Sequence, residues 1–381
     1  MSNDDDRKTV TIHRPTGPRV LPSWEEPKSR GSLAVLGAAA GRAVGSAFRK
    51  LPRVDVRKAA AIAGTLSLAG IFHAVAAGAV SHVFSAMMMG LVAFSAPTGG
   101  GGGGSYTGPG DTFSTSAVGY YSCAQAWNGA YASSAGSLCD LVDSAAPTTV
   151  ICTLKSTTSG SADLAGTYCT GGLTPSAKCA AATGGVCNIS KVYNQVSPGT
   201  YDLVQATAAN QPPLTFSSTP TGTLPAINCG NGSTVSYVAS AANMPVSQPF
   251  TLAMVINRTT GSTAGGALGP SSAGLFGSTA SANTIGSTWG ATLTATMSDA
   301  AWHFTSNLVN GASSAINVDG TETTGNVGAN SINGFPFRIC RANATQQAGL
   351  IAEGIVWGAA TTSTDRNNLS INAHSSGRYN F

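Results

Sequence analysis

The carboxylates of this chain are few, and they limit the acid–base chemistry that its larger part could perform. Hydrolysis of a glycosidic bond with retention needs two carboxyl groups about 5–5.5 Å apart, one as nucleophile and one as acid and base. We consider Asp299 and Glu353 as weak catalytic candidates, although for Glu353 pairing or capping beside a strand is the simpler expectation. Residues 111–381 contain ten acidic side chains, at positions 111, 140, 143, 163, 202, 299, 319, 322, 353 and 365.

Nucleophilic catalysis by a serine or cysteine has no support in the sequence pattern. Of the five histidines, only His303 and His374 lie beyond residue 111. Neither stands near a residue that we would identify as a nucleophile, and there is no Gly-Asp-Ser type of motif. We therefore predict no histidine that acts as a general base.

All eight cysteines lie beyond residue 111, and we expect them to form disulfides. An even number in an exported domain favours disulfides, although eight cysteines allow 105 pairings. Zinc is the rival explanation, but the chain has no Cys-x-x-Cys pair and no nearby histidine cluster. The cysteines are Cys123, Cys139, Cys152, Cys169, Cys179, Cys187, Cys229 and Cys340.

A stretch without Asp, Glu, Lys or Arg separates two chemically different parts of the chain. Residues 1–58 carry 12 Lys+Arg and 6 Asp+Glu, a net charge of +6, and residues 111–381 carry 8 and 10, a net charge of −2; together these give +4. The larger part is slightly acidic, so we expect no binding to nucleic acid. Residues 1–30 lack apolar periodicity, and residues 31–58 predict either a basic flank that orients the next helix or a basic helix along the inner leaflet. We therefore expect residues 1–58 to form a disordered basic tail on the cytoplasmic side.

The uncharged stretch begins with a long apolar run over residues 59–96. This run exceeds the roughly 20 residues that one bilayer span needs. We expect one transmembrane helix, a signal anchor that leaves the C-terminal domain outside the cytoplasm. The alternative is cleavage near Ala96, which would release a secreted protein. Residues 97–110 contain six consecutive glycines and predict a flexible linker, with residues 111–381 as the folded domain.

The folded part has the texture of an all-β protein. Short apolar runs such as 149–154 and 250–256 are bounded by Gly, Pro, Asn or Ser. Turn dipeptides such as Asn310-Gly311 and Asp319-Gly320 recur, where glycine accepts a positive φ. Only residues 133–142 and 364–373 predict short helices. The pattern favours a β-sandwich or jelly roll.

Several segments together resemble a known family. Four segments are similar to the first half of the α-L-arabinofuranosidase B catalytic domain: residues 137–142, 153–158, 192–195 and 203–207. Four more fit the wider concanavalin A-like, laminin-G-like sandwich superfamily: residues 248–252, 302–304, 316–320 and 349–356. The resemblance implies a concanavalin-like jelly roll, in which a Trp-His strand and a strand ending in Asp-Gly form a hairpin.

The resemblance also implies where catalytic carboxylates should stand, and this chain lacks them there. The family's nucleophile is a glutamate, but the matching residues 289–301 contain none. Its acid and base is an aspartate, but the matching residues 340–344 read Cys-Arg-Ala-Asn-Ala. Asp299 stays open as a substitute. We therefore leave catalysis uncertain and favour a non-catalytic relative; an active form would be a glycoside hydrolase of the arabinofuranosidase type.

Glycan binding does not require these carboxylates. Sugar sites stack rings on aromatic side chains and recognise hydroxyls with Asn, Asp and Gln. A calcium ion, which related sandwiches often hold, needs clustered oxygen ligands, and the sparse acids argue against it; we expect no cofactor and no metal. The candidate ligand-binding residues are Trp127, Tyr193, Asn194, Gln195 and Trp289.

These observations favour a membrane-tethered or exported domain that binds a glycan or polysaccharide or mediates surface adhesion. Two alternatives stay open. One is an active α-L-arabinofuranosidase-like glycoside hydrolase, and the other is a structural protein of a phage virion or a cell surface.

Overall fold

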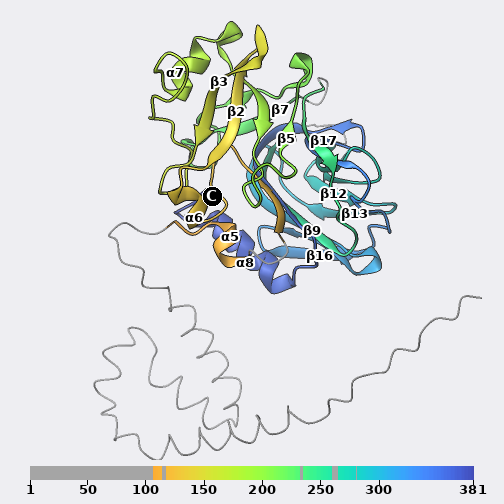
Figure 1. Ribbon diagram of the computed structural model, residues 1–381. Helices are drawn as coiled ribbons and strands as arrows, with labels where there is room; N and C mark the ends of the chain where they lie inside the picture. Colours follow the sequence, from red (N-terminus) through yellow and green to blue (C-terminus); the bar gives the residue numbers. More distant parts are fainter. Residues whose placement is uncertain (1–105, 114–116, 232–234, 260–264, 280) are drawn as a thin grey trace, which may run out of the picture. The chain divides into compact units, whose positions relative to one another are not determined.

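The computed structural model describes residues 106–113, 117–231, 235–259, 265–279 and 281–381. The expected basic tail, the apolar run 59–96 and most of the expected linker lie outside these residues. The described part consists of two β-sheets with few helices (Figure 1), which confirms the expected all-β sandwich and is consistent with a jelly roll. Within these ranges, no helix is both long and apolar enough to cross a membrane.

The first sheet has eight strands and is built around β9 and β19. Both central strands are almost wholly buried, because they lie between neighbouring strands and are covered on both faces. The order is β16-β15-β14-β9-β19-β7-β6, and β1 also pairs with β19. The strands are β1 (Ala117–Tyr121), β6 (Leu214–Thr215), β7 (Ala226–Asn231), β9 (Phe250–Arg258), β14 (Trp302–Val309), β15 (Ser314–Val318), β16 (Thr321–Gly325) and β19 (Ala348–Trp357).

The second sheet has eleven strands in the order β13-β12-β11-β10-β18-β17-β8-β5-β4-β2-β3. Its apolar faces contribute side chains such as Leu268, Phe276 and Ile339 to the main core. The strands are β2 (Ser137–Asp143), β3 (Ala146–Lys155), β4 (Asn188–Val192), β5 (Leu203–Val204), β8 (Val238–Asn243), β10 (Gly265–Pro270), β11 (Leu275–Ser278), β12 (Thr284–Thr288), β13 (Thr292–Thr296), β17 (Pro336–Ala342) and β18 (Thr345–Gln346).

The longest helix, α8 (Ser363–His374), confirms the expected helix over 364–373. It begins with a capping box: the Asp365 N–H donates to Thr362 Oγ1 at 3.1 Å, and the Thr362 N–H donates to Asp365 Oδ2 at 2.9 Å. The other helices are short: α5 (Pro109–Thr112), α6 (Gly129–Ser133), α7 (Pro175–Ala180) and the 3-10 turns η1 (Thr183–Gly185), η2 (Ala208–Asn210) and η3 (Gly311–Ser313).

Two sequence-based expectations about local structure need correction. The helix expected over 133–142 is wrong, because residues from Ser137 onward form strand β2. This strand is buried on both faces, so its apolar residues do not alternate with polar ones, and their spacing also fits a helix. The expected linker extends too far, because the Tyr106 side chain is buried and α5 packs its glycines against Trp127.

Three disulfides confirm much of the expected cysteine framework and indicate an oxidising environment. Cys152–Cys169 and Cys179–Cys187 close local loops with sequence separations of 17 and 8. Cys229–Cys340 has a separation of 111 and joins β7 to β17, so it connects the two sheets.

The remaining two cysteines correct that expectation. Cys123 and Cys139 are buried free thiols. They lie within hydrogen-bonding reach of each other, and burial together with that contact raises the pKa of the Cys139 thiol. They are adjacent but not bonded.

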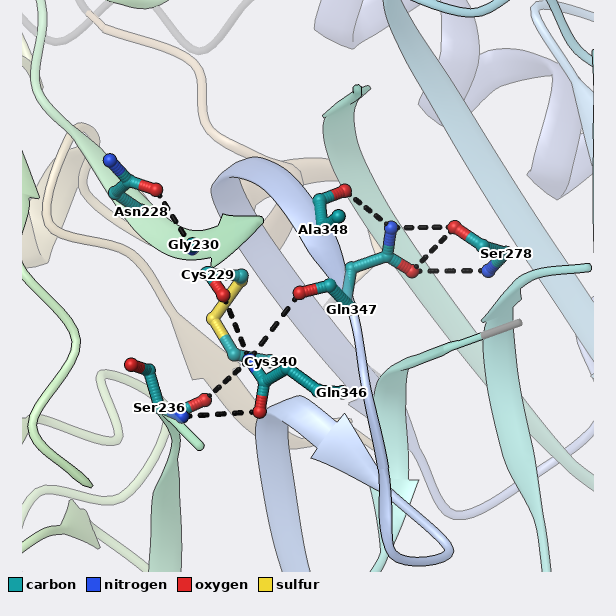
Figure 2. Close-up of a disulfide and its surroundings, with 9 residues drawn as sticks. All are labelled: Asn228, Cys229, Gly230, Ser236, Ser278, Cys340, Gln346, Gln347 and Ala348. Carbon is teal, nitrogen blue, oxygen red and sulfur yellow. Dashed lines mark hydrogen bonds between the residues drawn. A yellow bond between two sulfur atoms is a disulfide. The ribbon is translucent and has the colours of Figure 1, made fainter. Parts of the chain in front are cut away.

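Figure 2 shows the surroundings of the inter-sheet disulfide. Gln346 Nε2 donates to the carbonyl oxygens of Cys229 and Ser236, at 2.8 Å each. The Gln347 amide bonds to the Ser278 hydroxyl at 2.6 Å. Two buried glutamine amides therefore fix the strands on either side of the disulfide.

Candidate functional site

The two candidate catalytic carboxylates are both buried and ion-paired. Asp299 Oδ1 lies 2.9 Å from Arg258 Nε, with side-chain exposures of 4% and 0%. Glu353, fully buried on β19, pairs with Arg378 and accepts hydrogen bonds from the hydroxyls of Tyr120 (2.6 Å) and Tyr379 (3.2 Å). Each of the two carboxylates is thus neutralised by a buried cation of the protein itself.

The other eight carboxylates of residues 111–381 also have partners within the protein. Asp111, Asp143, Asp163 and Asp365 accept hydrogen bonds from backbone N–H groups. Asp140 accepts from two hydroxyls, Asp202 pairs with Lys191, Asp319 contacts two histidines, and Glu322 pairs with Arg366. Among the hydrogen bonds and ion pairs described, no two of the ten share a partner.

The two segments that match the family's carboxylate-bearing segments carry other side chains at those places. Residues 289–301 run from the end of β12 through β13, and the only acid there is the buried Asp299. In residues 340–344, Cys340 is tied to Cys229, and the neighbouring Gln346 and Gln347 provide amides (Figure 2). Amides can accept and donate hydrogen bonds but do not transfer protons at neutral pH.

Four of the five expected ligand-binding residues are buried and hold the fold together. The Trp289 ring packs edge-on against Phe250 at a centroid distance of 4.9 Å. Asn194 is fully buried, and its amide donates to the carbonyls of residues 118 and 200 at 3.0 and 2.7 Å. Gln195 Oε1 accepts from the backbone N–H of Trp127 at 2.8 Å, and both residues are buried. Burial removes these four from contact with a surface ligand.

Tyr193, the fifth expected residue, is partly exposed. Its hydroxyl donates to Asp140 Oδ2 at 3.0 Å, and Lys191 Nζ lies 4.1 Å from its ring centroid. Burial and the Asp140 charge raise the pKa of its hydroxyl. Its ring face is thus already covered by a cation.

A cavity lies where the start of the folded domain meets its C-terminus. Its volume is about 710 Å³, within the range of small-molecule sites. We call it the polar cavity, because most of its side chains carry hydroxyl or amide groups. It is lined by Tyr106, Thr107, Gln125, Ser159, Ser161, Thr221, Thr223, Leu224, Asn372, Ser375, Ser376, Gly377 and Arg378.

Segments that are far apart in the sequence build this cavity. Asn372 Nδ2 donates to the carbonyl of Thr107 at 3.2 Å, and Gln125 Nε2 donates to the carbonyl of Arg378 at 3.2 Å. Figure 1 shows the C-terminus beside α5 and α6. These two hydrogen bonds tie the last residues of the chain to the first part of the domain.

The wall formed by Tyr106 depends on a glycine. The Tyr106 hydroxyl donates to the carbonyl of Ala126 at 2.5 Å. Its ring lies on Gly160, where an added Cβ would stand 2.2 Å from the ring, and Gly160 has a φ of +81°. Tyr106 and Leu224 supply the apolar part of the wall. The cavity thus combines an aromatic ring with many hydroxyls, as sugar sites do.

Two buried polar atoms of the cavity residues lack protein partners. Gln125 Oε1, an acceptor, and Arg378 Nε, a donor, make no hydrogen bond to any described residue. Both atoms have almost no solvent-accessible surface, so they lie behind the cavity wall rather than on it.

The charge behind the cavity is fixed by a buried cluster around Arg378. Burial lowers the pKa of its guanidinium, but the charge of Glu353 and the nearby tyrosines raise it more, so that the net pKa lies above the usual value. Burial, followed by the Glu353 charge, raises the pKa of Tyr120 and Tyr379. Arg378 is a permanent cation whose charge is largely met by Glu353.

The pairing of a histidine with a hydroxyl was not predicted from the sequence. Contrary to expectation, His303 is paired with a nucleophile type: Ser298 Oγ lies 2.8 Å from its Nε2. Its Nδ1 lies 2.5 Å from Asp319 Oδ2, and His374 Nε2 lies 3.4 Å from Asp319 Oδ1. The expected Asp-Gly turn at Asp319 is confirmed, with φ of 49° and 88° at its two residues. In the described ranges, no group of three or more His, Cys, Asp or Glu side chains could hold a metal ion.

Comparisons with known proteins identify the fold. No protein-family model matches the sequence, and no curated protein matches it either. A GH54 α-L-arabinofuranosidase soaked with a cyclic sulfate inhibitor matches with a TM-score of 0.50 at 14% identity, over 70% of this chain and 64% of its own. A glutamate-to-glutamine mutant of a GH54 α-L-arabinofuranosidase, soaked with 4-nitrophenyl α-L-arabinofuranoside, gives the same values. An arabinofuranosidase complexed with arabinofuranosyl-α-1,2-xylobiose has a TM-score of 0.48 at 13% identity.

This chain spans 64% of the length of those matching structures. At 14% identity the similarity concerns the fold and not the activity. It confirms the resemblance seen in the short segments. The described domain therefore shares the sandwich fold of GH54 α-L-arabinofuranosidases.

Proposed function

We propose that the described domain is a carbohydrate-binding domain that does not cleave glycosidic bonds. The polar cavity carries this proposal, because it combines an aromatic wall with many hydroxyl and amide groups. All ten carboxylates of residues 111–381 form hydrogen bonds or ion pairs within the protein, which supports the absence of glycosidase activity. The disulfides support action outside the cytoplasm. We further propose that residues 59–96 anchor the protein in the membrane or, if cleaved near Ala96, direct its secretion.

A glycan array tests binding. The full-length protein in detergent, fluorescently labelled, should bind a defined subset of glycans, and arabinofuranosyl-bearing xylans should be among those tested. A signal no higher than that of detergent-solubilised carrier protein on every glycan would contradict carbohydrate binding. That result would favour a structural protein of a virion or cell surface.

Hydrolysis of 4-nitrophenyl α-L-arabinofuranoside tests the second half of the proposal. We expect no release of nitrophenol above the buffer blank, because both candidate catalytic carboxylates are held in buried ion pairs. Release by the wild type that disappears in a folded Asp299→Asn variant would show an active glycosidase. Circular dichroism should accompany this variant, since Asp299 pairs with Arg258.

A further inference from the structure

We propose that Ser298, His303 and Asp319 form a second site, a serine hydrolase site that cleaves esters of small acyl groups. His303 Nε2 lies 2.8 Å from Ser298 Oγ, and His303 Nδ1, on the other side of the ring, lies 2.5 Å from Asp319 Oδ2. A hydroxyl, an imidazole and a carboxylate in this relation are the parts of a serine nucleophile with its base and orienting group. Such a triad is recognised by geometry and not by sequence order. None of these three residues lines the polar cavity, although the cavity beside Asp319 shares Ser375 with it.

The turn that carries Ser298 is held on both sides. Before it, the Met297 N–H donates to the carbonyl of Asn283 at 2.9 Å. After it, the Asp299 carboxylate pairs with Arg258, and the Ala300 N–H donates to the Arg258 carbonyl at 2.7 Å. Ser298 itself is exposed. A rigid turn thus presents an exposed hydroxyl to the imidazole, as a nucleophile requires.

The carboxylate is held equally firmly. Asp319 lies in the hairpin between β15 and β16, where Val318 pairs with Thr321. Its Oδ1 accepts the Phe304 N–H at 2.9 Å, which leaves Oδ2 for His303. The ionised carboxylate accepts the proton of Nδ1–H, so Nε2 carries the lone pair that accepts the Ser298 hydroxyl. This is the tautomer that a general base needs.

An amide that could stabilise an oxyanion lies beside the nucleophile. Asn283 Oδ1 accepts the N–H of Asp299 at 3.0 Å, so the Asn283 amide stands against the peptide that follows Ser298. We assign the Nδ2 of this side chain as the oxyanion donor of the proposed site. A side-chain amide is among the groups that stabilise the tetrahedral intermediate of acyl transfer.

The reaction proceeds in two steps, the acylation of Ser298 and the hydrolysis of the acyl-serine. The Ser298 oxygen attacks the ester carbonyl carbon while its proton moves to His303 Nε2. The protonated imidazole then gives this proton to the alcohol oxygen as the carbon–oxygen bond breaks, leaving an acyl-serine. Water next attacks the acyl carbon and gives a proton to Nε2. Return of this proton to the serine oxygen releases the carboxylic acid and restores Ser298.

The surroundings favour a small acyl group on a polar alcohol, such as an acetylated sugar. Ser298 is exposed, so an ester on a large molecule can reach it from solvent. Asp319 also lines a cavity of about 450 Å³ that can take the alcohol part of an ester. The other residues of this cavity are Asn367, Ser370, Ile371, His374 and Ser375.

Turnover and covalent labelling of the full-length protein test the proposal together. The protein should hydrolyse 4-nitrophenyl acetate, and a fluorophosphonate should add to Ser298, with fluoride as the leaving group. Ser298→Ala should abolish labelling, and both Ser298→Ala and His303→Gln should lower kcat by roughly 10³-fold or more. The matched control Ser272→Ala changes another exposed serine and should keep the wild-type rate. An adduct on a different residue, or a wild-type rate in Ser298→Ala, would overturn the proposal.

Asp319 is a positioning residue, and its role can be separated from a purely structural one. Asp319→Asn keeps an oxygen for the Phe304 N–H and tolerates the positive φ, but it offers an N–H₂ group to His303. The imidazole then takes the wrong tautomer. We expect kcat to fall about 10³–10⁴-fold with KM little changed, and fluorophosphonate labelling to slow in parallel. A variant that melts earlier yet keeps its kcat would show that Asp319 only holds the hairpin.

Discussion

Replacing Arg378 by methionine is expected to lower the free energy of unfolding by about 3–5 kcal/mol, because it leaves the Glu353 carboxylate buried without its cation. Both side chains are almost completely buried, with exposures of 1% for Arg378 and 0% for Glu353. The hydroxyls of Tyr120 and Tyr379 would still donate to the carboxylate, but they carry no compensating charge. The loss should appear as a lower urea midpoint with an unchanged slope.

Two further variants make this result specific. Lys155→Met removes an exposed cation for which no ion pair is described, and it should change stability by less than about 0.5 kcal/mol. The double variant Glu353→Met/Arg378→Met removes both charges and should recover much of the loss. A single Arg378→Met variant that costs less than about 1 kcal/mol would show that the pair is not buried as described.

Removing the Cys229–Cys340 disulfide by two alanines should lower the free energy of unfolding by about 4–5 kcal/mol. The bond closes a loop with a sequence separation of 111 and joins the two sheets. In the chain-entropy description, a cross-link stabilises more when the loop it closes is longer. The measurement is urea unfolding of the oxidised wild type and of Cys229→Ala/Cys340→Ala.

The Cys179–Cys187 disulfide provides the matched comparison, since its sequence separation is only 8. Its double alanine variant should lose about 2–3 kcal/mol by the same reasoning. Equal losses for the two pairs would contradict the special role of the inter-sheet bond. Mass spectrometry after alkylation should confirm that Cys123 and Cys139 are free in both variants.

Much of the fold could be predicted from local patterns. The runs 149–154 and 250–256 lie within β3 and β9, and the Trp-His strand pairs with the Asp-Gly strand as the resemblance implied. The helix expected over 133–142 was wrong because a strand buried on both faces loses the alternation that identifies it. Short apolar runs thus identified strands, including the almost wholly buried β9, but the apolar spacing in β2 also fitted a helix.

The candidate sites were harder to predict, because tertiary contacts create them. Tyr106, Gln125 and Arg378 meet only because the chain's end returns to the start of the domain. Trp127 and Trp289 are of a residue type that is common in sugar sites, but both are buried in the core. Sequence shows residue type and not exposure.

The histidine site left a signal that could have been found. The predicted hairpin pairs Thr305 with Val318, and this register brings Asp319 beside Phe304 and His303. The position of Ser298 was less accessible, because it depends on the turn after β13 and on the Arg258–Asp299 pair. The contact of Asp319 with His303 follows from strand register, whereas the position of Ser298 depends on the folded turn.

Glycan binding in the polar cavity can be tested by changing one exposed residue that lines it. Thr223→Trp places a large side chain at the cavity and leaves every residue of the buried cluster around Arg378 unchanged. Thr324→Trp makes the same change on the exposed face of β16, away from the cavity residues. Both variants should remain folded, because surface substitutions have small effects on stability.

The most direct measurement is titration calorimetry of the best array glycan with the wild type and these two variants. Binding in the polar cavity predicts that Thr223→Trp weakens the affinity at least about tenfold, or roughly 1.4 kcal/mol, while Thr324→Trp binds like the wild type. Equal affinities for all three proteins would contradict a glycan site in this cavity.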